Sequence, residues 1–131
     1  MKLITRNTDY AVRAVAYMAK KSGAIVTAAE MVAKLKIPRP FLRKIMQQLN
    51  RAGVVRSTRG IGGGFILVRE PDKVRLTDIA KIFQGSFKLN ECSFKKSLCG
   101  NRKICPLKKK IDAMESYIVE QLKGITLKDL I

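Results

Sequence analysis

Apolar side chains recur at intervals of three and four near the start of the chain and predict a helix over residues 8–21. Thr8 or Asn7 is the candidate N-cap, and Gly23 follows the end of the helix. Residues 24–26 form a short link that suits an edge strand. The chain is therefore expected to open with one amphipathic helix and a short extended segment.

Two further helical segments follow, separated by a turn that contains two prolines. The first begins at Thr27, a good N-cap with Glu30 three residues later, and runs to about Leu35. The second covers residues 39–52, where apolar residues including Phe41 share one side and basic and amide side chains lie on or flank the other. Together they predict a helix-turn-helix unit.

Two strands are expected next, over residues 54–58 and 65–69, joined by the sequence RGIGGG. The glycines do not form a dinucleotide fingerprint, because Phe65 occupies the third glycine position and a strand follows. A plain hairpin turn would need fewer glycines. We therefore expect a wing whose backbone approaches DNA closely, with Arg59 directed at a minor groove.

The carboxy-terminal part contains a short helix from residue 77 to Gly85, a cysteine-containing segment, and a long helix from Pro106 to about Lys123. The long helix has an apolar stripe made of Leu107, Ile111, Met114, Ile118 and Leu122. Its near-heptad spacing favours packing against a second copy of the chain. Packing on the chain's own core is the alternative.

The predicted fold is mainly α with a small β-hairpin. We expect a winged helix-turn-helix DNA-binding domain over residues 1–85 and a cysteine-containing loop over residues 86–105. A dimerisation helix with a C-terminal tail follows over residues 106–131. A length of 131 residues suits one domain with an appendage.

The charge of the chain is strongly unbalanced, with 27 basic and 10 acidic residues and a net charge of +17. Between residues 34 and 69 there are nine basic residues and no acidic one. These are Lys34, Lys36, Arg39, Arg43, Lys44, Arg51, Arg56, Arg59 and Arg69. Because the excess is concentrated in one segment, it favours double-stranded DNA as partner over a merely solvated basic surface.

The rest of the sequence argues against several classes of protein. No apolar run is long enough for a membrane span, and charges interrupt the first residues where a signal peptide would be apolar. We therefore expect a cytoplasmic protein with reduced cysteines. The chain has no histidine and no grouping that resembles a nucleophile–base pair, so an enzyme is not expected. A redox or electron-transfer protein with an incidental basic surface is the alternative from another class.

The three cysteines, Cys92, Cys99 and Cys105, have the spacing C-x6-C-x5-C. This differs from the paired C-x2-C of structural zinc sites. Three thiolates can hold a metal or an iron–sulfur cluster if another group completes the set. Neighbouring lysines and arginines would equally favour reactive thiols. The spacing alone leaves a metal centre and reactive or incidental thiols open.

The amino-terminal NTDYAVRAVAYMA, the wing TRGIGGGF and the loop cysteines together resemble the Rrf2 family of bacterial transcription regulators. The resemblance covers nearly the whole chain. It implies a homodimer of winged helix-turn-helix subunits crossed by long C-terminal helices, acting as a transcription regulator. We expect this regulator to be a repressor. It also implies an iron–sulfur cluster on the three cysteines that controls DNA binding, although some relatives act without one through thiols or a partner protein.

The subgroups of this family differ in the fourth cluster ligand. One subgroup has a histidine three residues after the last cysteine, where this chain has Lys108. The nitric oxide-sensing subgroup uses an aspartate near the start of the first helix, donated by the other subunit, and Asp9 matches it. A helix-dipole role for Asp9 is the alternative. The first cysteine gap is one residue longer than is common there, which leaves [2Fe-2S] and [4Fe-4S] open.

The expected DNA contacts follow from the helix-turn-helix and wing. We expect the start of the third helix in the major groove and the wing beside it. The residues concerned are Thr27, Arg39, Pro40, Arg43, Lys44, Arg56, Arg59, Gly60, Gly62 and Gly63. Relatives with the histidine ligand carry a glutamate at the position of Arg43, so operator preference should differ here.

Overall fold

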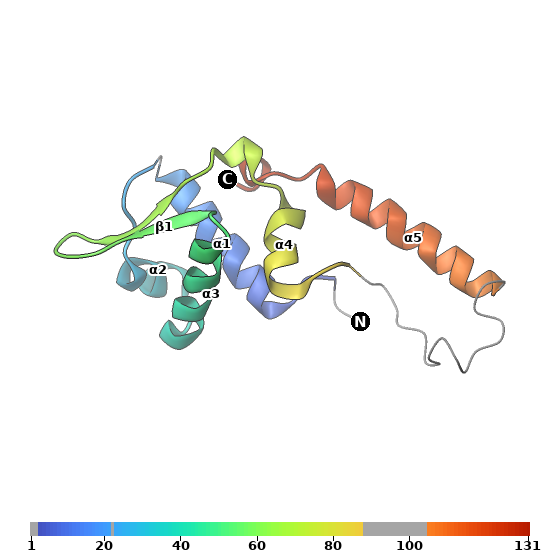
Figure 1. Ribbon diagram of the computed structural model, residues 1–131, viewed down its shortest axis with the longest axis horizontal. Helices are drawn as coiled ribbons and strands as arrows, with labels where there is room; N and C mark the ends of the chain where they lie inside the picture. Colours follow the sequence, from blue (N-terminus) through green and yellow to red (C-terminus); the bar gives the residue numbers. More distant parts are fainter. Residues whose placement is uncertain (1–2, 22, 88–104) are drawn as a thin grey trace.

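The structure is a computed structural model and describes residues 3–21, 23–87 and 105–131 (Figure 1). In these ranges the elements are α1 (Arg6–Lys20), α2 (Ala28–Leu35), α3 (Arg39–Arg51), β1 (Val55–Thr58), β2 (Gly64–Leu67), the 3-10 helix η1 (Pro71–Lys73), α4 (Leu76–Gln84), α5 (Pro106–Lys123) and the 3-10 helix η2 (Leu127–Leu130). The predicted mainly helical fold with one hairpin is confirmed.

The core forms around α1, which packs against α2, α3, α4 and η2. Its inner face carries small residues, among them Ala11 and Ala14, both fully buried. Small side chains let neighbouring helices approach closely, and larger residues such as Met18 fill the space between them. From α3, Leu42, Met46 and Leu49 complete the same core. The helix-turn-helix is therefore built on α1.

The start of α1 corrects one prediction. The N-cap is Thr5, whose side-chain oxygen accepts a hydrogen bond from the Thr8 backbone N–H at 3.3 Å. Thr8 itself lies inside the helix and is fully buried. Its hydroxyl donates to Oε1 of Gln84 at 2.7 Å. The helix extends further toward the N-terminus than predicted because a residue of α4 satisfies the Thr8 side chain.

The predicted cap of α2 is confirmed in part. The hydroxyl oxygen of Thr27 accepts a hydrogen bond from the Glu30 N–H at 3.0 Å. The Glu30 carboxylate does not return to Thr27; it accepts a hydrogen bond from the hydroxyl of Tyr17 on α1. Lys21 also lies 3.8 Å from this carboxylate. The capping-box glutamate thus joins α2 to α1 instead of closing the helix end.

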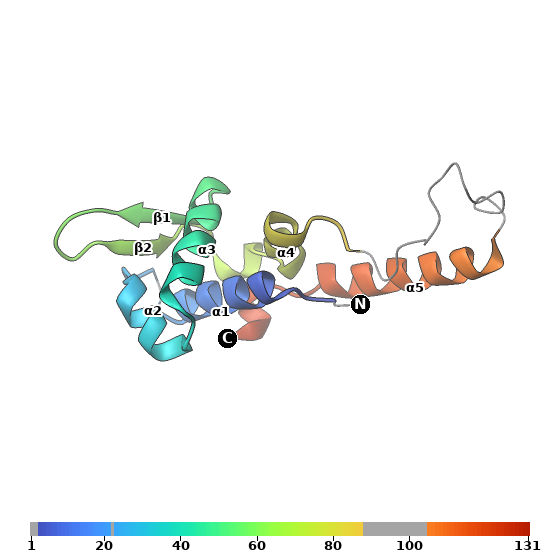
Figure 2. The same ribbon diagram turned by 90° about the horizontal axis from the view of Figure 1, so that it is seen from below.

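The hairpin carries a third extended segment at its side. Strands β1 and β2 are antiparallel, with Val55 opposite Leu67 and Thr58 opposite Gly64. Val26 and Phe65 exchange backbone hydrogen bonds of 2.9 and 2.8 Å. The edge strand expected at residues 24–26 is therefore present as a single bridge. In Figures 1 and 2 the hairpin projects past α2 and α3.

The C-terminal tail returns to the main core. The Leu127 N–H donates to the Val74 carbonyl and the Leu76 N–H donates to the Ile125 carbonyl, both at 2.9 Å. Leu127 is 1% exposed and belongs to the main core. Between α4 and this tail, α5 extends away from the rest of the molecule (Figures 1 and 2).

The apolar stripe of α5 is buried only at its C-terminal end. Leu122 is 7% exposed, whereas Leu107 and Met114 are 67% and 58% exposed. Packing on the chain's own core therefore accounts for one end of the stripe and not for the rest. Among the described helices, none has the length and apolar character that crossing a bilayer requires.

Candidate nucleic-acid interface and cysteine site

The outer face of α3 is basic because all of its apolar residues except Pro40 and Phe41 are buried in the core. Leu42, Ile45, Met46 and Leu49 are at most 2% exposed. The polar positions between them face solvent, and they are Arg39, Arg43, Lys44, Gln47 and Gln48. A helix with one buried stripe and one cationic face can enter a groove of DNA without disturbing the core.

Within the part of the chain that the structure describes, these cations have no acidic partners. In the described ranges no carboxylate forms an ion pair with any of the nine basic residues between residues 34 and 69. The acidic residues pair elsewhere, for example Asp9 with Arg13 at 3.1 Å. An uncompensated cationic surface attracts a polyanion and releases its counterions on binding.

The third helix begins with a proline turn. Pro38 precedes α3 and Pro40 occupies its first turn, where a missing N–H costs nothing. Phe41 was predicted to face the core but is 37% exposed. It packs instead against α1, with its ring centroid 6.4 Å from that of Tyr10 in an edge-on arrangement. The core is closed by Leu42, so Phe41 is left at the rim between α3 and α1.

The backbone conformation and the close contacts of the wing loop require its glycines. Gly60 and Gly62 have φ of +96° and +78°, a conformation in which a side chain is strained. A Cβ on Gly63 would lie 2.6 Å from the Thr58 carbonyl oxygen, and one on Gly64 would lie 2.6 Å from that of Val26. All four glycines are therefore needed by the hairpin. The expectation that a plain hairpin would need fewer is wrong for this loop.

The remaining evidence for a wing is the chemistry that the loop displays. Arg56 on β1 and Arg59 beside the loop are both exposed, and Ile61 at the tip is fully exposed. Thr58 fixes the base of the loop, since its hydroxyl oxygen accepts the Gly64 N–H at 2.9 Å. The loop therefore presents a cation on a backbone that is held at its base.

The cysteine site lies mostly outside the described residues, because Cys92 and Cys99 fall in residues 88–104. Cys105 is described; it is a partly buried free thiol directly before α5. Within the described ranges no group of three potential metal ligands is present. The start of α5 and α1, which carries Asp9, lie apart in both views (Figures 1 and 2).

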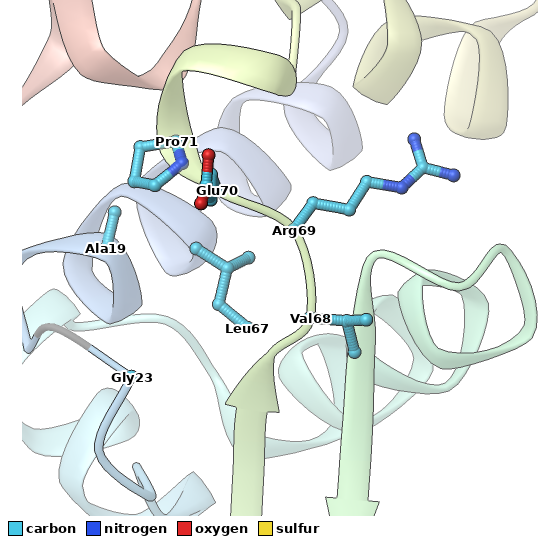
Figure 3. A pocket seen from close by; sticks show the side chains of 7 residues that line it. All are labelled: Ala19, Gly23, Leu67, Val68, Arg69, Glu70 and Pro71. Atoms are coloured by element: carbon cyan, nitrogen blue, oxygen red, sulfur yellow. The ribbon is translucent and has the colours of Figure 1, made fainter.

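A pocket of about 300 Å³ lies between the end of α1 and the segment after β2 (Figure 3). Ala19, Leu67 and Pro71 give it an apolar lining. The Arg69 side chain points away from Leu67 and Pro71 (Figure 3). The described lining residues include no cysteine or other nucleophile, so we assign the pocket no chemistry.

Two sets of contacts at α1 were not predicted from the sequence. Arg6 lies over the Phe41 ring, with its guanidinium carbon 4.9 Å from the centroid. Gln84 accepts hydrogen bonds from both Thr5 and Thr8. No sequence signal marked Arg6, because the helix was predicted to begin after it and its aromatic partner lies on another helix. Nothing local marked Gln84, since its partners are more than seventy residues away.

Comparison with known proteins identifies the family of this chain. The sequence profile of the Rrf2 family, described as "Iron-dependent Transcriptional regulator", matches residues 4–131. The chain belongs to the Rrf2 family. The resemblance found in the sequence is confirmed, and this Rrf2 protein is a transcriptional regulator, in a family of regulators and not of enzymes.

Individual relatives agree over almost the whole chain. The "Putative HTH-type transcriptional regulator" of Aquifex aeolicus is 39% identical over 124 residues, 93% of this chain and 86% of the relative. The HTH-type transcriptional regulator NsrR of Bacillus licheniformis is 30% identical over 133 residues, covering 100% and 92%. The structure of CymR, the global cysteine regulator of B. subtilis, has a TM-score of 0.77 at 23% identity, covering 99% and 96%. This last similarity establishes the fold.

Proposed function

We propose that this Rrf2 regulator is a homodimeric repressor that binds operator DNA through α3 and the wing, under the control of an iron–sulfur cluster. The observation that carries the DNA-binding part is the run of nine basic residues, between residues 34 and 69, that no described carboxylate neutralises. Such a surface binds the phosphate backbone, and side chains of the inserted helix then read base edges.

The roles within the interface follow from position. Arg39, Arg43 and Lys44, with Pro40 beside them, stand on the solvent face of α3 and approach the major groove. Arg59 enters the adjacent minor groove, where the backbone of Gly60, Gly62 and Gly63 comes close. Thr27 and Arg56 meet flanking phosphates; the hydroxyl oxygen of Thr27 already caps α2 and so holds that helix start in place.

The proposed dimer rests on α5. Its exposed stripe, with Leu107 and Met114 more than half exposed, is the kind of seam that two antiparallel or crossed helices bury. A dimer places two copies of α3 on two half-sites about one DNA turn apart. Helix α1, which carries Asp9, and the start of α5, which follows Cys105, lie apart within one chain, and this supports donation of Asp9 from the partner subunit.

The donor set of the chain fits an iron–sulfur cluster. Cys92, Cys99 and Cys105 supply three thiolates, there is no histidine, and Asp9 offers an oxygen. When bound, such a cluster supplies one-electron chemistry and reactivity toward nitric oxide or oxygen. Asp9 is half-buried and pairs with Arg13, so it would have to exchange this partner to act as a ligand. Cys105 directly precedes α5, so whatever its thiolate binds affects where that helix starts.

A second candidate uses the cysteines as thiols. The fold matches that of CymR, described as a global cysteine regulator, and the spacing of the cysteines also allows reactive thiols. In that case the DNA-binding surface is unchanged, and control passes to thiol oxidation or a partner protein.

One experiment separates the two. Protein purified without oxygen is assayed for iron and acid-labile sulfide, and its binding to a duplex selected from a randomised library is measured against bulk competitor DNA. The cluster proposal expects iron, sulfide and a visible chromophore, and a change in affinity when the chromophore is destroyed. Colourless, iron-free protein that binds the selected duplex tightly would favour the thiol candidate. Absence of any preference for the selected duplex would contradict the DNA-binding proposal itself.

A further inference from the structure

Arg6 at the start of α1 is a cation without an acidic partner. It is exposed, and the next acid along the helix, Asp9, pairs with Arg13. In the described ranges no carboxylate forms an ion pair with Arg6. Because the dipole of a helix disfavours positive charge at its N-terminus, local electrostatics do not explain this arginine.

Arg6 nevertheless has an aromatic partner. Its guanidinium carbon lies 4.9 Å from the centroid of the Phe41 ring. Tyr10 packs edge-on against the same ring, with a centroid separation of 6.4 Å and an interplanar angle of 63°. A stacked guanidinium uses its flat face for the ring and keeps the N–H donors in its plane available. The stack therefore orients the group without satisfying its donors.

The backbone that carries Arg6 is also fixed. The Thr5 N–H donates to Oε1 of Gln84 at 3.0 Å, and the Thr8 hydroxyl donates to the same oxygen at 2.7 Å. The Gln84 amide in turn donates to the Leu3 carbonyl at 2.9 Å. Arg6 thus lies between two residues tied to α4. A side chain that is already ordered loses less entropy on binding a ligand.

We propose that Arg6 binds a phosphate of the DNA backbone next to the site read by α3. Phe41 belongs to the first turn of α3, directly after Arg39 and Pro40. The Arg6–Phe41 stack therefore extends the cationic face of α3 onto α1. Guanidinium groups bind phosphate with two parallel hydrogen bonds. Such a contact fixes how the protein sits on the duplex and carries no sequence information.

This inference rests on the proposed DNA-binding function and names a further residue of its interface. Since a phosphate contact is independent of sequence, a fluorescently labelled duplex of mixed sequence serves as probe. The variants are Arg6→Gln and Arg6→Lys, with Lys128→Ala as a control. Lys128 is exposed on η2 and lies outside the proposed interface, and its replacement removes the same charge as Arg6→Gln.

For Arg6→Gln we expect roughly three- to tenfold weaker binding. The slope of log affinity against log salt concentration should become shallower by about one unit. Arg6→Lys keeps the charge and should retain the salt slope, but should bind more weakly because an ammonium neither stacks as a plane nor binds in two-pronged fashion. Lys128→Ala should change the slope by much less than Arg6→Gln.

Phe41→Leu tests the stack separately. It keeps an apolar side chain at the rim, so we expect weaker binding with an unchanged salt slope. In an Arg6→Gln background the same change should have little further effect, since the two residues act as one unit. A melting curve for each variant identifies any loss of affinity caused by unfolding.

The outcomes are distinct for the two proposals. Equal affinity and slope for Arg6→Gln and Lys128→Ala, while Arg59→Ala binds more weakly, would overturn the role of Arg6 and leave the DNA-binding proposal standing. Additive effects of Arg6→Gln and Phe41→Leu would overturn the role of the stack. Failure of the unmodified protein to bind the duplex would instead contradict the proposed function.

Discussion

Single residues of the wing give the most direct test of the proposed interface. Arg59 is exposed beside a loop whose base is fixed by Thr58 and Gly64. Replacing Arg59 with alanine should weaken operator binding by about 1–3 kcal/mol, because a groove contact is lost while the hairpin remains. Fluorescence anisotropy at fixed salt measures this, with Lys128→Ala as the charge control. Unchanged affinity would remove the wing from the interface.

Gly63 allows a prediction about stability at the same loop. A Cβ there would lie 2.6 Å from the Thr58 carbonyl oxygen and 2.9 Å from that of Gly60. Because both neighbours are backbone atoms, Gly63→Ala should destabilise the fold by about 1–3 kcal/mol in urea denaturation. Gly124→Ala is the matched control: its new Cβ would meet Gln121 at an ordinary 3.5 Å, so this variant should be neutral or slightly stabilised. Equal effects of the two changes would contradict the argument.

Tyr17 gives a prediction about pH. The hydrogen bond from its hydroxyl to Glu30, followed by burial and the charge of that carboxylate, raises the pKa of Tyr17 above its ordinary value of 10.0. Folding thus favours the neutral phenol, so its contribution is complete below pH 10.0 and is lost as pH rises through the folded-state pKa. Tyr17→Phe should lower the melting temperature at neutral pH, and the difference from the unmodified protein should shrink above that pH.

Circular dichroism melts across pH measure this difference. The matched control is Tyr117→Phe, since Tyr117 is 67% exposed on α5 and far along the chain from Glu30. It should leave the melting temperature unchanged at every pH. A pH-independent effect of Tyr17→Phe would show that the hydroxyl contributes through something other than its bond to Glu30.

Residues were predictable from sequence where their partners are local. Thr27 was identified as a cap because Glu30, whose N–H it binds, is three residues away. Thr8 was misread as a cap because its true partner, Gln84, is 76 residues away. Phe41 has the spacing of a core residue, yet Tyr10 and Arg6 hold it at the rim. A periodic pattern shows which side of a helix is apolar but not which neighbour covers it.

At the scale of elements, helices with local sequence signals were predicted correctly, whereas contacts between distant segments were not. The helices of the helix-turn-helix and α5 were predicted to within one residue at either end, since their apolar periodicity and capping residues are local signals. The C-terminal tail forms η2. The burial of this tail was not predicted. It depends on a backbone hydrogen bond from Leu127 to Val74, and a contact between such distant residues leaves no local sequence pattern.

The proposed role of α5 gives a prediction for this element. Met114 is 58% exposed on the apolar stripe, so Met114→Glu should place a charge in the seam and dissociate the dimer. Ser116→Glu is the control, since Ser116 is exposed and off the stripe. Sedimentation at several concentrations should show a smaller species for Met114→Glu alone. That variant should also bind a duplex with two half-sites more weakly. An unchanged assembly would show that the stripe serves another partner.

At the scale of the whole molecule, both ends of the segment that holds Cys92 and Cys99 lead to the DNA-binding unit. On one side it follows α4, whose last residue Gln84 is bonded to Thr5 and Thr8 at the start of α1. On the other side it leads through Cys105 into α5, which is anchored at its far end by Leu122 and, beyond it, Leu127. A change in the cysteine segment can therefore act on α1, which packs against α3, and on α5, the proposed dimerisation helix.

The decisive prediction concerns this coupling. With all three cysteines replaced by alanine, the protein should still bind its selected duplex, because none of them belongs to α3 or the wing. It should no longer respond to nitric oxide or to an iron chelator. The unmodified protein should change its affinity about 5- to 150-fold under the same treatments, the range typical of coupling between two sites. Titration of the labelled duplex under anaerobic conditions measures both proteins. A triple variant that responds like the unmodified protein would place the control elsewhere in the chain, since no thiolate would remain to carry it.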